Sequence, residues 1–144
     1  MGIGGMSKAT IIYGPPGSGK TTYVLKRMRR GDVVIDFDLI FSAISGRNPH
    51  DKPANLLKLA WDIRDDVYRR VVEHREEVGK IWVVIGGAKR AERAMIASWF
   101  NADLHHVEAT PNECYARMRD DKTRPGGWQA SKEIVDKWFR QYEK

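Results

Sequence analysis

The chain has 144 residues, and its 42% apolar and 31% charged residues are typical of a globular protein and exclude a disordered one. Twenty-five lysines and arginines against nineteen aspartates and glutamates give a formal net charge of +6, which suits a polyanionic ligand but also a mildly basic protein without one. The single cysteine, Cys114, excludes an internal disulfide and a cysteine-rich zinc site. No apolar run approaches the roughly 18 residues of a membrane span, and no signal-peptide pattern opens the chain. We therefore expect one cytoplasmic domain over residues 1–144, without membrane contact and with the glycine-rich residues 1–7 flexible.

Apolar runs and glycine or proline breaks divide the sequence into alternating strands and helices. Residues 9–13 (ATIIY) and 81–85 (IWVVI) are uninterrupted apolar runs, as expected of strands that are covered on both faces. A further strand is predicted over 32–37 and a weaker one over 104–109, where His105 and His106 break the apolar pattern. Helices are predicted over 21–30, 39–44, 54–77, 89–100, 111–120 and 131–142.

Two helix starts carry capping signals. Residues 110–113 (TPNE) have the form of a capping box with proline at the first helical position, and Ser131 is expected to cap the last helix. Because each strand is followed by a helix, the strands should be parallel and the fold should be a three-layer α/β/α sandwich with a mostly parallel sheet. The pattern does not predict the order of the strands in the sheet.

One motif carries recognisable chemistry. Residues 14–21 (GPPGSGKT) fit the phosphate-binding P-loop pattern G-x-x-x-x-G-K-[ST], directly after a predicted strand and directly before a helix. Glycines let backbone N–H groups turn toward phosphates, and the helix N-terminus adds positive potential. We predict that Lys20 contacts the β- and γ-phosphates of ATP and that the Thr21 hydroxyl binds Mg²⁺. The residues expected to bind the nucleotide are Gly14, Pro15, Gly17, Ser18, Gly19, Lys20, Thr21 and Thr22.

A carboxylate is expected near such a site, but Gly86 and Gly87 follow the third strand, where many P-loop NTPases have an aspartate. The nearest strand-end carboxylates are Asp36 and Asp38, which would point to the same side if the strand is still extended there. One could accept the proton of an attacking hydroxyl while the other orients substrate or metal. Alternatively, Asp38 only caps the helix that follows.

The segments GPPGSGKTTYV, VIDFDLI and CYARMRDDKTRPGGW resemble, in their order and spacing, small phage P-loop kinases, and in particular the kinase domain of phage-type 5′-polynucleotide kinase. The resemblance implies a P-loop NTPase fold of the nucleotide-kinase type and, for a phage protein, a place in the host cytoplasm. It implies that Asp38 is the general base for a 5′-hydroxyl, which leaves Asp36 as a candidate metal ligand. The sequence departs from the family at Phe41, where the family has an arginine, and at Gly86-Gly87, where it has an aspartate.

The same resemblance points to residues 115–130 as a lid. An arginine of that segment would steady the transferring phosphoryl group, with Arg117 as the first match and Arg124 as the next. Arg119 belongs to the same basic segment, which flanks a possible hinge at Gly126-Gly127; the alternative is a solvated basic helix face. Trp128 could stack on a base or simply pack the lid.

Other residues carry weaker signals. Lys89, Arg90 and Arg93 could reach an acceptor phosphate or lie on an exposed helix face. The four histidines lack metal-ligand spacing. The tryptophans expected in the core are Trp82, Trp99 and Trp138.

The leading hypothesis is a kinase that moves the γ-phosphoryl of ATP to a hydroxyl, on a 5′-hydroxyl end of DNA or RNA or on a nucleotide-like molecule. The alternative is an NTPase that hydrolyses ATP for a DNA or protein partner and phosphorylates no acceptor. A third reading is a kinase of a free nucleoside or sugar. All three need a nucleoside triphosphate and Mg²⁺.

Overall fold

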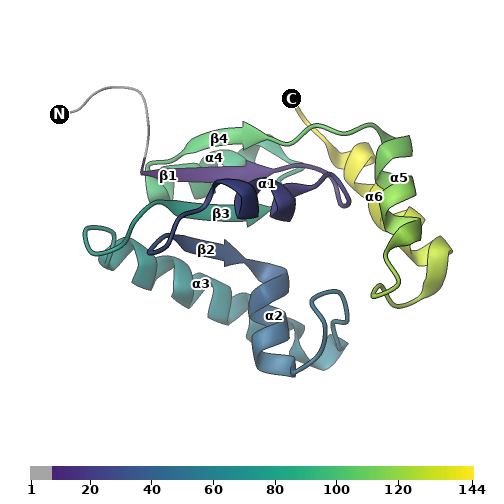
Figure 1. Cartoon of the computed structure of the whole chain (residues 1–144), viewed down its shortest axis with the longest axis horizontal. Coiled ribbons are helices and arrows are strands. Elements are labelled where there is room, and N and C mark those ends of the chain that lie inside the picture. Colours follow the sequence, from purple (N-terminus) through teal and green to yellow (C-terminus); the bar gives the residue numbers. More distant parts are fainter. Residues whose placement is uncertain (1–7) are drawn as a thin grey trace.

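A computed structural model describes residues 8–144, so the expected flexibility of residues 1–7 lies outside the described residues. The sheet consists of four parallel strands, and they appear where the sequence predicts strands (Figure 1). The strand order is β2-β3-β1-β4, with Ile11 of β1 paired to Val83 on one side and Leu104 on the other. The strands are β1 (Ala9–Tyr13), β2 (Val33–Asp36), β3 (Ile81–Ile85) and β4 (Asp103–His106).

Helices lie on both faces of the sheet, which confirms the three-layer α/β fold. On one face α3 and α4 pack through Tyr68 and Phe100 against strand residues such as Ile11 and Val83. On the other face, α1 is the one helix among residues 8–144 that contributes to the buried cluster around Ile12. The helices are α1 (Lys20–Arg27), α2 (Phe37–Ser45), α3 (Leu57–Glu73) with a preceding 3₁₀ turn η1 (Ala54–Leu56), α4 (Arg90–Phe100), α5 (Pro111–Asp120) and α6 (Gly127–Gln141).

Helices α5 and α6 form a hairpin beyond the end of the sheet to which the strands point (Figure 1). A small core of its own, centred on buried Cys114, Met118 and Val135, holds the two helices together. The predicted capping box starts α5: the Thr110 side chain accepts from the N–H of Glu113, and the Glu113 carboxylate accepts from the N–H of Thr110. The hairpin therefore stands at the strand ends where ligands of parallel α/β sheets bind.

Several helix boundaries differ from the prediction. Helix α1 ends at Arg27 rather than at residue 30, and α2 begins at Phe37, directly after β2. The expectation that Ser131 caps α6 is wrong, because Gly126, whose φ of 84° suits glycine, precedes a helix that already begins at Gly127. Ser131 is instead buried within that helix.

Two of the three tryptophans expected in the core are there. Trp82 is 5% exposed and Trp138 is 7% exposed, but Trp99 is 46% exposed. Trp99 lies on the outer side of α4 and meets Tyr68 only by an edge contact. In residues 8–144 no helix is long and apolar enough to cross a membrane.

Candidate active site

The P-loop connects β1 to α1 and has the backbone geometry that its glycines predict. Gly17 and Gly19 have φ angles of 78° and 95°, in the left-handed region that other residues rarely adopt. Gly19 precedes α1 and has no side chain that could cap it, so the first N–H groups of the helix are available to an anion. The Ser18 hydroxyl is buried and has no hydrogen-bond partner among the described residues. A phosphate oxygen would satisfy these donors.

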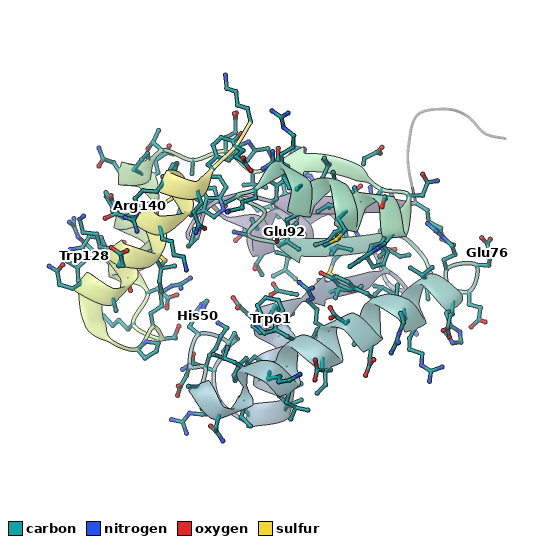
Figure 2. All side chains as sticks on the ribbon, turned by 180° about the vertical axis from the view of Figure 1, so that it is seen from behind. His50, Trp61, Glu76, Glu92, Trp128 and Arg140 are labelled. Carbon is teal, nitrogen blue, oxygen red and sulfur yellow. The ribbon has the colours of Figure 1, made fainter. Side chains whose placement is uncertain are left out.

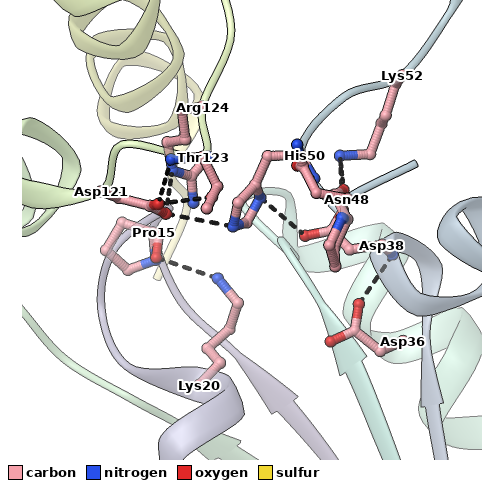
Figure 3. A network of polar contacts seen from close by, with 11 residues as sticks. Pro15, Lys20, Asp36, Asp38, Asn48, His50, Lys52, Asp121, Thr123 and Arg124 are labelled. Carbon is pink, nitrogen blue, oxygen red and sulfur yellow. Dashed lines mark hydrogen bonds and ion pairs between the residues drawn. The ribbon is translucent and has the colours of Figure 1, made fainter.

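Lys20 folds back over the loop to which it belongs (Figure 3). Its ammonium group donates to the carbonyl oxygens of Gly14 at 2.7 Å and Pro15 at 3.0 Å. Burial lowers the pKa of Lys20 to about 8, although the Asp36 and Asp38 carboxylates act in the opposite direction. Among residues 8–144 no carboxylate forms an ion pair with this partly buried ammonium, so it is well placed to gain from an arriving phosphate.

Asp36 and Asp38 have different local roles. Asp36 is the last residue of β2, and its Oδ1 accepts a hydrogen bond from the N–H of Asp38 at 2.9 Å, so that Asp36 caps α2. Asp38 lies in the first turn of the helix. The strand is no longer extended at Asp38, so the condition for placing both carboxylates on one side is not met, and the alternative that Asp38 is the cap is wrong. Burial raises the pKa of Asp36, and the neighbouring Asp38 carboxylate adds to this rise.

Asp38 belongs to a polar network that joins three segments (Figure 3). Lys52 Nζ lies 2.8 Å from one carboxylate oxygen of Asp38, and His50 Nδ1 lies 3.8 Å from the other. On its far side His50 Nε2 lies 3.3 Å from Asp121, which also pairs with Arg124 at 3.3 Å. The network thus connects α2, the loop after it and the α5–α6 hairpin. Figure 2 shows His50 on the side of its loop that faces the hairpin.

The sequence did not single out His50, Lys52 or Asp121. The segment NPHDKP reads only as a loop, and nothing in its composition indicates that its tip meets a hairpin far along the chain. Burial lowers the pKa of His50, and the Arg124 guanidinium acts in the same direction while the carboxylates oppose it.

The hairpin arginines are placed differently from one another. Arg117 Nη1 donates to the carbonyl oxygen of Gly17 at 2.9 Å, a contact between residues 100 positions apart. Arg124 lies in the network next to Asp121. Arg119 instead lies over the ring of Trp128, with its guanidinium carbon 4.3 Å from the ring centre. Arg117 therefore contacts the P-loop and Arg124 belongs to the polar network beside it. Arg119 takes part in neither contact.

Trp128 packs within the hairpin. Its ring meets Tyr115 edge to face, with ring centres 5.6 Å apart, and Figure 2 shows it on the outer side of the hairpin. These contacts favour the packing interpretation of Trp128 over stacking on a base.

At the end of β3, Gly86 and Gly87 are closed off by side chains from farther along the chain. Trp138 Nε1 donates to the carbonyl oxygen of Gly86 at 2.9 Å. The buried guanidinium of Arg93 donates to the carbonyl oxygens of Gly87 at 2.7 Å and Glu143 at 2.6 Å. Arg93 is therefore neither exposed nor free to reach an acceptor; it ties the C-terminal segment to the sheet.

Residues 10–144 match the family model described as AAA domain. The chain belongs to this family. No curated protein matches the sequence.

Solved structures show the same fold. A chain in the structure of the Pnkp1/Rnl/Hen1 RNA repair complex superimposes with a TM-score of 0.64 at 12% identity, over 98% of this chain and 48% of that one. Shikimate kinase from Bacteroides thetaiotaomicron superimposes with a TM-score of 0.61 at 14% identity, over 92% of this chain and 78% of that one. The chain spans about half the length of the repair-complex chain. Its fold is that of P-loop kinases.

The donor set suits a magnesium nucleotide. In the part of the chain that the structure describes, no three histidine, cysteine or acidic side chains form a metal-binding group. Mg²⁺ needs no such group, because it commonly binds one or two protein oxygens together with phosphates and water. Thr21 lies in the first turn of α1 and Asp36 ends β2, so both predicted metal ligands stand at the P-loop end of the sheet.

Proposed function

We propose that this protein transfers the γ-phosphoryl group of ATP to the hydroxyl of an acceptor. The observation that supports this most strongly is the convergence of three charged groups at the strand ends. Lys20 lies on the P-loop, and Arg117 contacts the same loop from the hairpin. The Asp38 carboxylate on α2 lies close enough to Lys20 to interact with its charge. A phosphoryl-transfer site needs a cation on the phosphates, a base for the hydroxyl and a second cation for the charge that develops.

Each residue then has a definite task. The P-loop N–H groups, the Ser18 hydroxyl and Lys20 would hold the phosphates, and Thr21 and Asp36 would hold Mg²⁺, which would supply positive charge to the nucleotide. Asp38 takes the proton of the acceptor hydroxyl as its oxygen bonds to the γ-phosphorus and the bond to the β-phosphate oxygen breaks.

Residues 115–130 act as the lid in this proposal. Arg117 and Arg124 stabilise the charge on the transferring group, and the lid turns back on itself at Gly126 and Gly127, both with positive φ. The Asp38–His50–Asp121 contacts would hold the lid against the base when no substrate is present.

The acceptor in this proposal is a 5′-hydroxyl nucleic-acid end or a nucleotide-like molecule. The similarity to a chain of an RNA repair complex supports a nucleic-acid end. The similarity to shikimate kinase supports the same transfer to a hydroxyl of a small molecule. The basic net charge of +6 favours the polyanion.

A second candidate is an NTPase that hydrolyses ATP for a partner and phosphorylates no acceptor. It is favoured by the absence of a carboxylate at Gly86-Gly87 and by Phe41, which is fully buried where the resembling family has an arginine. None of these three residues carries a charged side chain that could bind an acceptor.

Transfer of labelled γ-phosphate decides between the two. The protein with ATP and Mg²⁺ is offered 5′-hydroxyl DNA, 5′-hydroxyl RNA and a panel of nucleosides, with Lys20→Ala as the control. Label on an acceptor that disappears in the control supports the kinase and identifies the acceptor. Label found only in inorganic phosphate contradicts the kinase and supports the NTPase.

A further inference from the structure

A cleft lies away from the P-loop, on the sheet face that α1 covers. Its volume is about 810 Å³, and Thr10 and Trp82 of the central strands form its floor. These two residues are paired across β1 and β3 near the start of each strand. The cleft therefore lies toward the N-terminal end of the strands, whereas the P-loop lies at their C-terminal end. The cleft is there because α1 is only eight residues long and does not reach over the whole face.

The walls of this cleft are columns of stacked rings and cations. On one side the guanidinium of Arg27 lies 3.6 Å above the Tyr23 ring, and Tyr23 stacks on His105 with ring centres 4.4 Å apart. On the other side Lys80 Nζ lies 4.4 Å from the centre of the Trp82 ring. Aromatic faces hold these cations in place without neutralising their charge.

The cations of the cleft differ from those of α3. Arg27, Arg29 and Lys80 line it, and none of them forms an ion pair within residues 8–144. Lys26 and Arg30 extend the same basic segment, also without ion pairs in that range. On α3, by contrast, the cations pair with neighbouring carboxylates: Lys58 with Asp62, Arg64 with Asp65, Arg69 with Asp66 and Arg70 with Glu73.

The two carboxylates that line the cleft, Asp32 and Asp103, reduce this charge but are outnumbered by its three cations. Asp32 is occupied by three N–H donors, the Trp82 indole at 3.0 Å and the backbone of Arg29 and Lys80 at 2.9 Å each. Both of its oxygens therefore already accept hydrogen bonds from the protein. The favourable effect of cations near the end of α1 accounts for Lys26 and Arg27, but Arg29 and Lys80 lie outside the helix.

We propose that this cleft binds the sugar–phosphate backbone of single-stranded nucleic acid. Unpaired arginines and lysine would contact successive phosphates, and the arginine fork suits a phosphate in particular. Helix α1 joins the two sites: it starts at the P-loop and ends at the cleft, about 12 Å away at 1.5 Å per residue. Where the proposed kinase function holds, the cleft makes a strand with several nucleotides a better acceptor than a single nucleotide; the binding itself does not depend on that function.

Fluorescence anisotropy with a labelled single strand of about 20 nucleotides tests the binding, since single-strand sites cover roughly 4–16 nucleotides. The cleft variant is Arg27→Gln/Arg29→Gln/Lys80→Gln. The matched control, Lys58→Gln/Arg69→Gln/Arg70→Gln on α3, removes the same net charge. We expect the cleft variant to bind at least about tenfold more weakly and to lower the slope of log K against log salt by about 2, at roughly 0.7 per lost phosphate contact. The control should stay within about twofold of the wild type.

Three results would overturn the proposal: a cleft variant that binds like the wild type, a control that loses as much affinity, or binding to vesicles of anionic lipid without binding to the strand. Arg27→Lys/Arg29→Lys keeps the charge, and its retained binding together with an unchanged melting temperature would show that loss in the glutamine variant is not misfolding.

Failure of the kinase proposal gives a different pattern. Lys20→Ala should lose all transfer of phosphate and keep the affinity for the strand. If the kinase proposal holds, the cleft variant should lose transfer to the long strand but retain transfer to a nucleoside 3′-monophosphate. If binding of the strand depends on the cleft but no acceptor is phosphorylated, the kinase proposal is contradicted and the proposal for the cleft still holds.

Discussion

Replacement of Asp38 by asparagine is the sharpest test of the proposed chemistry. The substitution keeps the size and shape of the side chain and removes its ability to accept a proton. General-base catalysis contributes roughly 10²–10⁴ to rate, so kcat should fall by that factor, which corresponds to about 3–5 kcal/mol of transition-state stabilisation. ATP affinity should change less than about threefold, because Asp38 lies on α2 and makes no contact with the P-loop backbone.

The protein should remain folded in this variant. Asp38 is about 40% exposed, so its pair with Lys52 contributes no more than about 1 kcal/mol after solvent screening. Its backbone N–H, which the Asp36 carboxylate holds, is unaffected. The free energy of unfolding can be measured by urea denaturation to check this.

The matched control is Asp51→Asn, on the loop that carries Lys52. It removes one carboxylate that pairs with Arg47 and has no contact with Asp38. Single-turnover transfer from labelled ATP should be normal in this control. Wild-type turnover in Asp38→Asn, or an equal loss in both variants, would refute the assignment of Asp38 as the base.

Four further predictions concern pH and stability. With a pKa of about 8, Lys20 loses its proton as pH rises, so ATP affinity measured by calorimetry should fall above pH 8, whereas a Lys20→Arg variant that still binds should show no such fall. His50 and His106 have lowered pKa values, because burial disfavours their charged forms, so their contribution to stability is present at neutral pH and is lost as pH falls through their ordinary range near 6.5. In His50→Gln, the free energy of unfolding from urea melts should fall less steeply between pH 7.5 and 5 than in the wild type. An unchanged pH profile would contradict the burial argument. Gly17→Ala should destabilise the fold by about 1–2 kcal/mol and weaken ATP binding, because φ is 78° and the new Cβ would lie 3.1 Å from a carbonyl oxygen of α5; a thermal melt like that of the wild type would count against this. Thr110→Ala removes half of the capping box and should lower the free energy of unfolding by about 1 kcal/mol. Thr110→Ser keeps the hydroxyl and should retain that free energy.

The sequence determined the local features of this protein. The P-loop was visible because its glycines, lysine and threonine must stand at fixed spacing between a strand and a helix, and the capping box at residues 110–113 was visible because its two hydrogen bonds join neighbours in the chain. Strands β1, β2 and β3 followed from short apolar runs that end at glycine, proline or polar residues, whereas β4 (DLHH) gave only a weak signal. All of these signals act over a few residues, within the reach of a sequence pattern.

Only the tertiary structure decided which distant groups meet. His50 touches Asp121 and Arg117 touches Gly17, although long stretches of chain separate each pair. Trp99 and Trp138 both lie on helices with apolar neighbours, yet one is exposed and the other is buried under the end of β3. Periodicity assigns a residue to a face of its own helix and carries no information on what covers that face.

The same limit applies to charge. Along the sequence, the cations of α3 are interspersed with carboxylates, whereas residues 26–30 (KRMRR) contain none and Lys80 stands alone. The fold pairs the cations of α3 with carboxylates one turn away, because i to i+3 and i to i+4 neighbours share a helix face. It sets Arg27 and Lys80 on aromatic rings across an open sheet face instead. Helical spacing pairs the cations of α3, but only the tertiary structure brings Arg27 and Lys80 from distant segments to one cleft.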